Sequence, residues 1–302
     1  MTDTFNYFAF GLHIASELEC PELLPADPAP PDVWVRLGPT GDTLGDPPPG
    51  KVIVDAGPDV MQFVLDEVGR YSITGGDQIV IQRFPQAGDD KLRIYLLGAA
   101  FGALLYQRGF FPLHGSAIET SHGAVAFTGD SGNGKSTMAA AFHQRGCRIL
   151  ADDVCAIRLD DAGQPVVVPA FPQLNLWNDS LEKLGQTSTD LPRTRLYREK
   201  YGLAVWDGFR SETVPLRAVY QLVKIDAAEA GLQAVKGTEK IRLLRDNTAR
   251  RFMLNYLPDD TPLMRTLMVA AKTCRVARLV YPPQPFQLDE LADLLEKDIN
   301  LL

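Results

Sequence analysis

The chain has 302 residues and a net charge of −8, which argues against a nucleic-acid-binding protein, because such a protein needs a basic surface. Hydrophobic residues make up 45% and charged residues 23% of the sequence, as in an ordinary globular protein with a sizeable core, and these values exclude a wholly disordered chain. No stretch approaches the ~18 continuous apolar residues of a membrane-spanning helix. Residues 92–105 come closest, and we expect them to form a buried helix.

The cysteine pattern and the first residues indicate the cellular compartment of the protein. No C-x-x-C pair and no histidine at metal-ligand spacing accompanies the four cysteines, which are Cys20, Cys147, Cys155 and Cys274. The first residues lack the basic and then apolar run of a signal peptide. We therefore expect a cytoplasmic protein with reduced thiols and no membrane partner.

The first ninety residues predict a β-rich module. Their strand candidates are residues 7–14, 33–37, 62–68 and 70–83. The proline-rich residues 25–31 are expected to form a loop, since proline cannot sustain a regular ladder. Gly75-Gly76-Asp77 is expected to make a hairpin turn. The pattern changes after residue 90, so we place two domains at residues 1–90 and 91–302.

The second domain alternates strand and helix patterns, which predicts an α/β unit around a central sheet. Strands are expected at residues 113–119, 123–128, 148–159, 166–168, 217–224 and 275–280. Helices are expected at residues 136–145, 179–184, 239–254, 263–272 and 286–299, after the helix that ends near residue 109.

One segment fills every fixed place of the phosphate-binding pattern G-x-x-x-x-G-K-[ST], and it consists of Gly129, Asp130, Ser131, Gly132, Asn133, Gly134, Lys135, Ser136 and Thr137. A strand pattern precedes it and a helix pattern follows, as a phosphate loop requires. The glycines let backbone N–H groups surround phosphate oxygens, and the helix presents its positive end to the same anion. We expect ATP and Mg²⁺, with Lys135 reaching the β- and γ-phosphates and Ser136 ligating the metal.

Two other positions could place reactive side chains beside this loop. Asp152 and Asp153 follow a strand, where a carboxylate can face the γ-phosphate and its metal. Adjacent residues of an extended strand point to opposite sides, so we expect one acid to serve the metal and the other a substrate hydroxyl. His114 lies on the strand before the phosphate-loop strand, and a hairpin between the two would carry it back alongside the loop.

Residues 113–157 resemble the catalytic domain of the bacterial HPr kinase/phosphorylase family. The family pattern is His-Gly, then Gly-Asp-Ser-Gly-x-Gly-Lys-Ser, then Arg-Gly-x-Arg-Leu-x-Ala-Asp-Asp, with the spacings found here. The resemblance implies a P-loop kinase domain with a mixed central sheet after a smaller β-rich domain, and phosphoryl transfer from ATP to a protein serine. It also implies that Asp152 is the general base, that Asp153 helps hold Mg²⁺ and the phosphates, and that His114 supports Asp152.

The chain departs from that family at two places. Thr137 stands where the bifunctional enzymes carry glutamate, and residues 169–180 contain no acid matching their Glu-x-Arg-Gly-Leu-Gly loop. We therefore expect neither phosphorylase activity nor HPr as the acceptor. The segment from Phe171 to Trp177 is similar to divergent relatives that act on ribosomally made peptides, including lasso-peptide kinases that phosphorylate the C-terminal serine of a precursor.

Two basic clusters could neutralise a transferred phosphate or form solvated faces. The first basic cluster contains Arg193, Arg195, Arg198 and Lys200, and the second contains Arg242, Arg245, Arg250 and Arg251.

The sequence thus predicts an Mg²⁺/ATP-dependent serine kinase acting on a peptide or small protein. A small-molecule kinase and a nucleotide-sensing module without turnover remain alternatives. The acceptor, and whether the chain forms a homo-oligomer, stay open.

Overall fold

The computed structural model describes residues 3–41, 44–57, 59–185, 187–189, 191–194, 199–225, 229–256, 261–283 and 287–302. The chain divides into two compact units. Unit 1 contains Met1–Phe110 and Arg250–Pro262, and unit 2 contains Phe111–Ala249 and Leu263–Leu302. In the part of the chain described here, no helix is both long enough and apolar enough to cross a membrane.

Unit 1 is built on a mixed sheet that has eight strands among the described residues, in the order β3-β1-β2-β4-β8-β7-β6-β5. The strands are β1 (Phe5–Ala9), β2 (Leu12–Ser16), β3 (Leu24–Pro25), β4 (Val33–Leu37), β5 (Val52–Ala56), β6 (Val60–Leu65), β7 (Gly69–Thr74) and β8 (Gln78–Arg83). The hairpin turn expected at residues 75–77 is confirmed, because Thr74 pairs with Gln78. The single strand expected at residues 7–14 is wrong. Phe10 and Gly11 both have positive φ angles, 55° and 70°, and turn the chain between β1 and β2.

The helical segment after residue 88 belongs to unit 1. It runs as α1 (Asp89–Tyr95), a π-helical turn η1 (Leu96–Ala100) and α2 (Phe101–Gln107). Tyr71 of β7 donates a hydrogen bond from its hydroxyl to the carbonyl of Leu92 at 2.9 Å. The division therefore falls at Phe110 rather than near residue 90. The change of sequence pattern marks a change of secondary structure, whereas the hydrophobic core continues across it.

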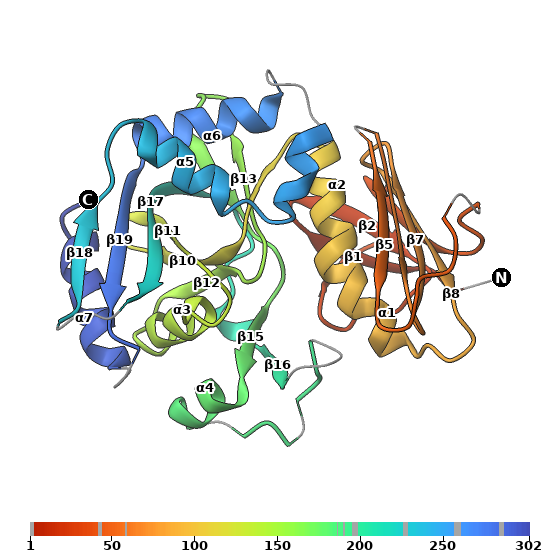
Figure 1. The fold of residues 1–302 in the computed structure, drawn as a ribbon, viewed down its shortest axis with the longest axis horizontal. Helices are drawn as coiled ribbons and strands as arrows, with labels where there is room; N and C mark the ends of the chain where they lie inside the picture. Colours follow the sequence, from red (N-terminus) through yellow and green to blue (C-terminus); the bar gives the residue numbers. More distant parts are fainter. Residues whose placement is uncertain are drawn as a thin grey trace. The chain divides into compact units, whose positions relative to one another are not determined.

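Unit 2 is an α/β unit with a mixed sheet, as expected, and the sheet has nine strands among the described residues. The order is β12-β10-β11-β17-β14-β13-β9, with β19 beside β17 and β18 beside β19 (Figure 1). These strands are β9 (Phe111–Leu113), β10 (Gly115–Thr120), β11 (Gly123–Thr128), β12 (Arg148–Ala151), β13 (Cys155–Leu159), β14 (Pro165–Val168), β17 (Val214–Lys224), β18 (Gly231–Ala234) and β19 (Arg275–Tyr281). A separate hairpin pairs β15 (Gln173–Trp177) with β16 (Lys200–Ala204).

Helices cover both faces of the unit 2 sheet. They are α3 (Lys135–Gln144), α5 (Thr238–Asp246), α6 (Pro262–Thr273) and α7 (Leu288–Ile299). The short helix α4 (Asn178–Lys183) packs on β15, and a short 3₁₀ turn, η2 (Trp206–Gly208), follows β16. Buried residues of α3 and α7 share one core with alternate residues of β17 and β19, such as Tyr220, Leu222 and Leu279. Figure 1 shows α5 and α6 on the other side of this sheet from α3.

Two strands expected from the sequence are each divided in the structure. Residues 113–119 split between β9 and β10, because β9 pairs with β13 whereas β10 pairs with β11 and β12. Residues 148–159 likewise split into β12 and β13. The two breaks place His114 and the Asp152-Asp153 pair in connections at strand ends.

The long helix expected at residues 239–254 is also divided. It ends at Asp246, where the Thr248 hydroxyl donates back to the carbonyls of Leu244 and Arg245 at 3.2 and 2.9 Å. Arg250 then has a positive φ of 53°, and a 3₁₀ turn, η3 (Arg251–Tyr256), follows in unit 1. The helix expected at residues 286–299 forms as α7, with Phe286 outside the described residues.

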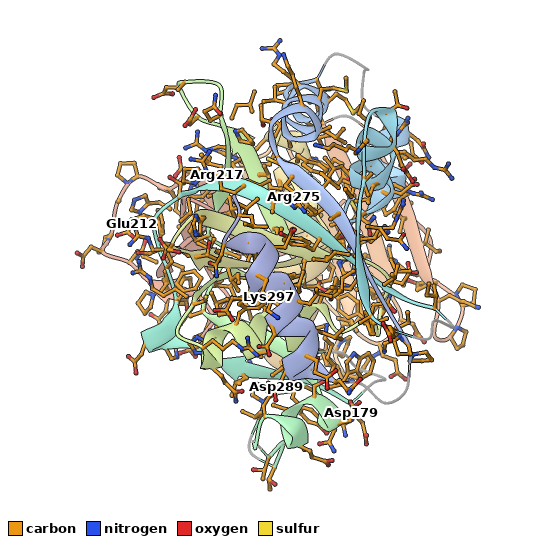
Figure 2. The ribbon with its side chains drawn as sticks, turned by 90° about the vertical axis from the view of Figure 1, so that its left-hand side faces the viewer. Asp179, Glu212, Arg217, Arg275, Asp289 and Lys297 are labelled. Atoms are coloured by element: carbon orange, nitrogen blue, oxygen red, sulfur yellow. The ribbon has the colours of Figure 1, made fainter. Side chains whose placement is uncertain are left out.

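A buried carboxylate fixes α7 to the sheet. Asp298 accepts hydrogen bonds from the Tyr220 hydroxyl at 2.7 Å and from Arg275 Nε at 2.5 Å, and Arg275 Nη2 pairs with its other oxygen. Figure 2 shows α7 lying across the sheet, with Asp289 and Lys297 along its length and Arg275 beside the end nearer Lys297.

Candidate active site

Four strands of unit 2 end at the same edge of the sheet. β17 is parallel to both β11 and β19. β10 is antiparallel to both β11 and β12, so β12 runs in the same direction as β11. The segments that follow β11 and β12, and the last residues of β17 and β19, therefore gather at one edge, where open α/β sheets bind ligands.

The phosphate loop follows β11 and has the backbone that its glycines permit. Gly129, Gly132 and Gly134 have φ angles of 125°, 89° and 80°. A Cβ on Gly129 would lie 2.4 Å from the carbonyl oxygen of Leu222 in β17, so only glycine fits there.

Neighbouring strands hold the outside of the loop. Asn133 donates from its side-chain amide to the Leu222 carbonyl at 2.9 Å, and its own carbonyl accepts from the Tyr281 hydroxyl at 2.6 Å. Lys224, the last residue of β17, donates to the Gly132 carbonyl at 2.6 Å. The cradle is thus held from β17 and β19.

Lys135 is the first residue of α3, and its side chain lies back over the loop. It is only 8% exposed, and its ammonium donates to the carbonyls of Gly129 and Asp130 at 2.8 and 3.1 Å. Two causes lower the pKa of Lys135 from its usual value of 10.5. Burial is the larger cause, and the positive charge of Lys200 is the second. Nearby carboxylates act in the opposite direction and raise the pKa. A bound anion would relieve both the burial cost and the repulsion.

Of the other predicted loop residues, Asp130 and Ser131 are exposed at the tip, whereas Thr137 is buried with its hydroxyl 2.9 Å from the Ser180 hydroxyl. Thr137 therefore faces the protein interior.

Asp152, directly after β12, is buried and engaged through both carboxylate oxygens. Oδ1 accepts hydrogen bonds from the hydroxyls of Ser116 and Ser136, the latter at 2.9 Å. Oδ2 accepts the backbone N–H of Asn175 at 2.6 Å. The carboxylate therefore links the phosphate-loop serine to the hairpin β15–β16.

Asp153 lies beside His114. It has a positive φ of 69°, and Nδ1 of His114 is 2.9 Å from its carbonyl oxygen and 4.0 Å from its Oδ1. His114 is held in turn through its backbone N–H, which donates to the Asn247 carbonyl at 2.8 Å, and through its carbonyl, which accepts from the Thr128 hydroxyl at 2.8 Å. The hairpin expected to bring His114 to the loop is confirmed. The ring of His114 lies against Asp153, and its support of Asp152 stays a prediction.

The hairpin β15–β16 is the part of the site that the sequence did not predict. Leu174 and Leu176 on one of its faces are buried in the core cluster. Gln173 and Asn175 alternate with them, and the Gln173 amide donates to the Asn175 side-chain oxygen at 3.0 Å. The Gln-Leu-Asn-Leu alternation at residues 173–176 is a strand signal that could have revealed it.

The structure describes two members of the first basic cluster, and the second basic cluster is divided between the two units. In the first, Lys200 lies on β16 opposite Trp177, and Arg193 pairs with Tyr201, while Arg195 and Arg198 lie outside the described residues. The second is shared between units, with Arg242 and Arg245 in unit 2 and Arg250 and Arg251 in unit 1. The positive charge of Lys200 contributes to lowering the pKa of Lys135.

These residues fit a nucleoside triphosphate with Mg²⁺. Within the described residues no group of three or more His, Cys, Asp or Glu side chains forms a ready metal cage. Mg²⁺ in phosphate-loop sites takes most of its ligands from phosphates and water, with one loop hydroxyl and an acid behind it. Ser136 with Asp152 supplies that pair, and the role of Asp153 as a metal ligand stays a prediction.

Comparison with models of known protein families gave no match, and comparison with curated proteins gave none either. Among solved structures, the Hpr(Ser) kinase/phosphatase from Coxiella burnetii is similar over 62% of this chain and 89% of its own, with 13% sequence identity and a TM-score of 0.32. A TM-score of this size does not establish a shared fold, so the function below rests on the residues of this chain.

Proposed function

We propose that this protein transfers the γ-phosphoryl group of ATP, bound with Mg²⁺, to a serine hydroxyl of a peptide or small protein. The observation that carries the proposal is the hydrogen bond from Ser136 to Asp152 at the end of the phosphate loop, with Asp153 as the next residue. One acid thus backs the metal-binding hydroxyl, and the adjacent acid lies beside His114.

The loop N–H groups and Lys135 would bind the phosphates, and Ser136 with Asp152 would hold the metal ion, which would neutralise phosphate charge. The serine oxygen forms a bond to the γ-phosphorus. The bond from that phosphorus to the β–γ bridging oxygen breaks, and its electron pair stays on ADP. The serine proton passes to a carboxylate.

Asp153 suits that proton better than Asp152. Both oxygens of Asp152 already accept hydrogen bonds, and the residue is 5% exposed. The Asp153 side chain is 16% exposed beside that of His114 at 30%, so a substrate hydroxyl can reach it. We therefore assign Asp153 as the general base and His114 as the residue that positions it, which exchanges the roles implied by the family resemblance.

The proposed acceptor is the C-terminal serine of a ribosomally made, lasso-type precursor peptide. This finer choice is supported by the similarity of residues 171–177 to divergent kinases of such peptides. The polar face of the hairpin β15–β16, with Gln173 and Asn175, would lie next to that acceptor.

The test is mass spectrometry of serine-terminated peptides after incubation with the protein, ATP and Mg²⁺. Asp153→Asn is expected to lower transfer about 100-fold or more while nucleotide affinity stays nearly unchanged, since it removes only the base. Asp152→Asn is expected to weaken Mg²⁺-dependent nucleotide binding as well. The assignment is overturned if Asp153→Asn retains full transfer and Asp152→Asn loses transfer alone.

Other outcomes distinguish the alternatives. Phosphorylation of a small metabolite with no peptide labelling would identify a small-molecule kinase. Tight ATP binding without transfer to any acceptor, unaffected by either aspartate substitution, would identify a nucleotide-sensing module.

A further inference from the structure

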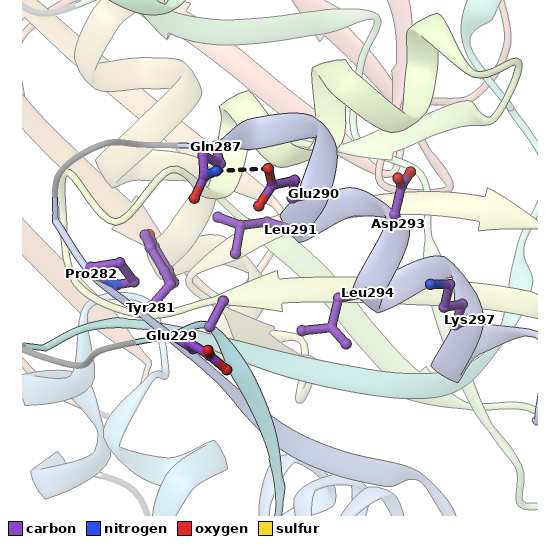
Figure 3. Close-up of a pocket in the computed structure, with 10 residues that line it drawn as sticks. Glu229, Tyr281, Pro282, Gln287, Glu290, Leu291, Asp293, Leu294 and Lys297 are labelled. Carbon is purple, nitrogen blue, oxygen red and sulfur yellow. Dashed lines mark hydrogen bonds between the residues drawn. The ribbon is translucent and has the colours of Figure 1, made fainter.

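A cavity of about 530 Å³ lies at the end of β19. Its walls are the chain at Tyr281 and Pro282, the residues just before β18, and the face of α7 that carries Leu291 (Figure 3). This volume is within the range of about 300–1,000 Å³ that small-molecule sites occupy.

The cavity shares a wall with the phosphate loop. Tyr281 lines the cavity, and its hydroxyl donates to the carbonyl of Asn133 in the loop at 2.6 Å. A ligand in the loop and a ligand in the cavity would therefore lie on either side of the same side chain.

The strand order gives the direction of a bound triphosphate. Asp152 follows β12, which is separated from β11 by β10, whereas Tyr281 ends β19, on the opposite side of β11 beyond β17. In the proposed function, the γ-phosphate faces Asp152 and Asp153. The nucleoside end must then leave towards β17 and β19, about 10 Å across two strand spacings, where the cavity lies.

The lining chemistry fits an aminated purine and not another phosphate. Two lining acids, Glu229 and Glu290, outnumber the one lining base, Lys297, and the third lining acid, Asp293, is paired with Arg145 of α3. Carboxylates repel phosphate but accept hydrogen bonds from amino and ring N–H groups. Gln287 donates to Glu290 at 2.7 Å, which fixes that carboxylate at the rim, as Figure 3 shows.

We propose that the cavity between β19, β18 and α7 binds the base of the nucleoside triphosphate, with a preference for a base that carries an amino group. This inference rests on the proposed function and specifies its donor substrate. The apolar surfaces of Pro282 and Leu291 would cover the ring, and Glu290 would accept from its amino group.

The experiment compares two ligands, ATP and inorganic triphosphate, each with Mg²⁺, by isothermal titration calorimetry. Ala230 lines the cavity and is exposed, so Ala230→Trp should fill the cavity without disturbing the core. We expect it to weaken ATP binding at least tenfold and to change triphosphate binding less than twofold. The matched control is Ala162→Trp, at an exposed alanine in the turn between β13 and β14, which should alter neither.

A second measurement tests whether the protein recognises the amino group of the base. The unaltered protein is expected to prefer ATP over ITP, whose base carries an oxygen in place of the amino group, and Glu290→Gln should remove most of that preference. The inference is overturned if the unaltered protein binds ATP and triphosphate equally well, or if Ala230→Trp leaves ATP affinity unchanged. If the unaltered protein binds neither ligand, the proposed function fails and this inference fails with it.

Discussion

Lys200 acts on the phosphate loop from a different element, the strand β16. Its positive charge is the second cause of the lowered pKa of Lys135, after burial. Burial and the charge of Lys200 both disfavour the protonated form of Lys135, and a bound polyphosphate would offset both effects. This effect of its charge gives Lys200 a role in binding the triphosphate that is open to measurement.

We predict that Lys200→Met raises the pKa of Lys135, because protonating Lys135 no longer opposes a neighbouring charge. The same substitution should weaken ATP binding by about fivefold, or ~1 kcal/mol. NMR titration of the lysine side chains measures the first effect and calorimetry the second. Lys236→Met, which removes an exposed lysine of the same unit, should change neither. A Lys135 pKa that stays constant in Lys200→Met would refute the coupling.

Two glycines of the phosphate loop, Gly129 and Gly132, allow a comparison of what a side chain costs at a positive φ. Both have positive φ, but a Cβ on Gly129 meets the Leu222 carbonyl at 2.4 Å, whereas nothing lies within 4 Å of one on Gly132. We predict that Gly132→Ala costs about 1 kcal/mol of unfolding free energy and Gly129→Ala about 3 kcal/mol. Denaturant unfolding measures both, and equal costs would show that the contact with β17 is unimportant.

At the scale of elements, the position of α7 decides the shape of the cavity beside the phosphate loop. The helix is fixed by Asp298, whose carboxylate binds the buried Tyr220 hydroxyl and the partly exposed Arg275. Arg145 on α3 also pairs with α7, through Asp293 at 2.7 Å, but that carboxylate is 59% exposed. The buried interaction of Asp298 should therefore stabilise the protein more than the exposed ion pair of Asp293.

We predict that Asp298→Ala destabilises the protein by about 2–3 kcal/mol, since it leaves the Tyr220 hydroxyl buried without its acceptor. Asp293→Ala should cost at most about 0.5 kcal/mol, as is usual for exposed ion pairs. Urea unfolding of both variants gives the comparison. Similar losses from the two substitutions would mean that α7 is held mainly by its apolar face.

The elements also show where sequence patterns are informative. The helix α3 and the strand β11 were predicted because a glycine-rich loop between an apolar strand and a helix is a local signal. The strands around His114 and Asp152 were predicted too long, since a run of strand-forming residues does not reveal that its two halves pair with different partners.

At the scale of the whole molecule, the chain crosses between its units more than once. Residues Arg250–Pro262 return to unit 1 from within unit 2. The helical segment α1–α2, which the sequence assigned to the second domain, contributes buried residues to unit 1, among them Leu92, Leu96 and Phe101. The packing of buried residues, and not the change of sequence pattern, therefore decides where unit 1 ends.

We predict that a fragment of residues 1–110 unfolds cooperatively, whereas a fragment of residues 1–90 does not, because the shorter one exposes the apolar face that the helices cover. Thermal unfolding followed by circular dichroism distinguishes them. Both fragments lack residues 250–262, so the comparison isolates the helices. A stable fold of residues 1–90 alone would restore the boundary near residue 90.

The sequence by itself determined the phosphate loop and the two acids that follow β12, because glycine freedom, the Lys-Ser pair and strand–loop–helix order are all local features. Only the tertiary structure decided which acid meets Ser136, which acid meets His114, that Tyr281 contacts the loop, and that the charge of Lys200 acts on Lys135. Those contacts depend on strand order and on the pairing of β16 with β15, and residues brought together across a sheet leave no periodic signal in the chain that carries them.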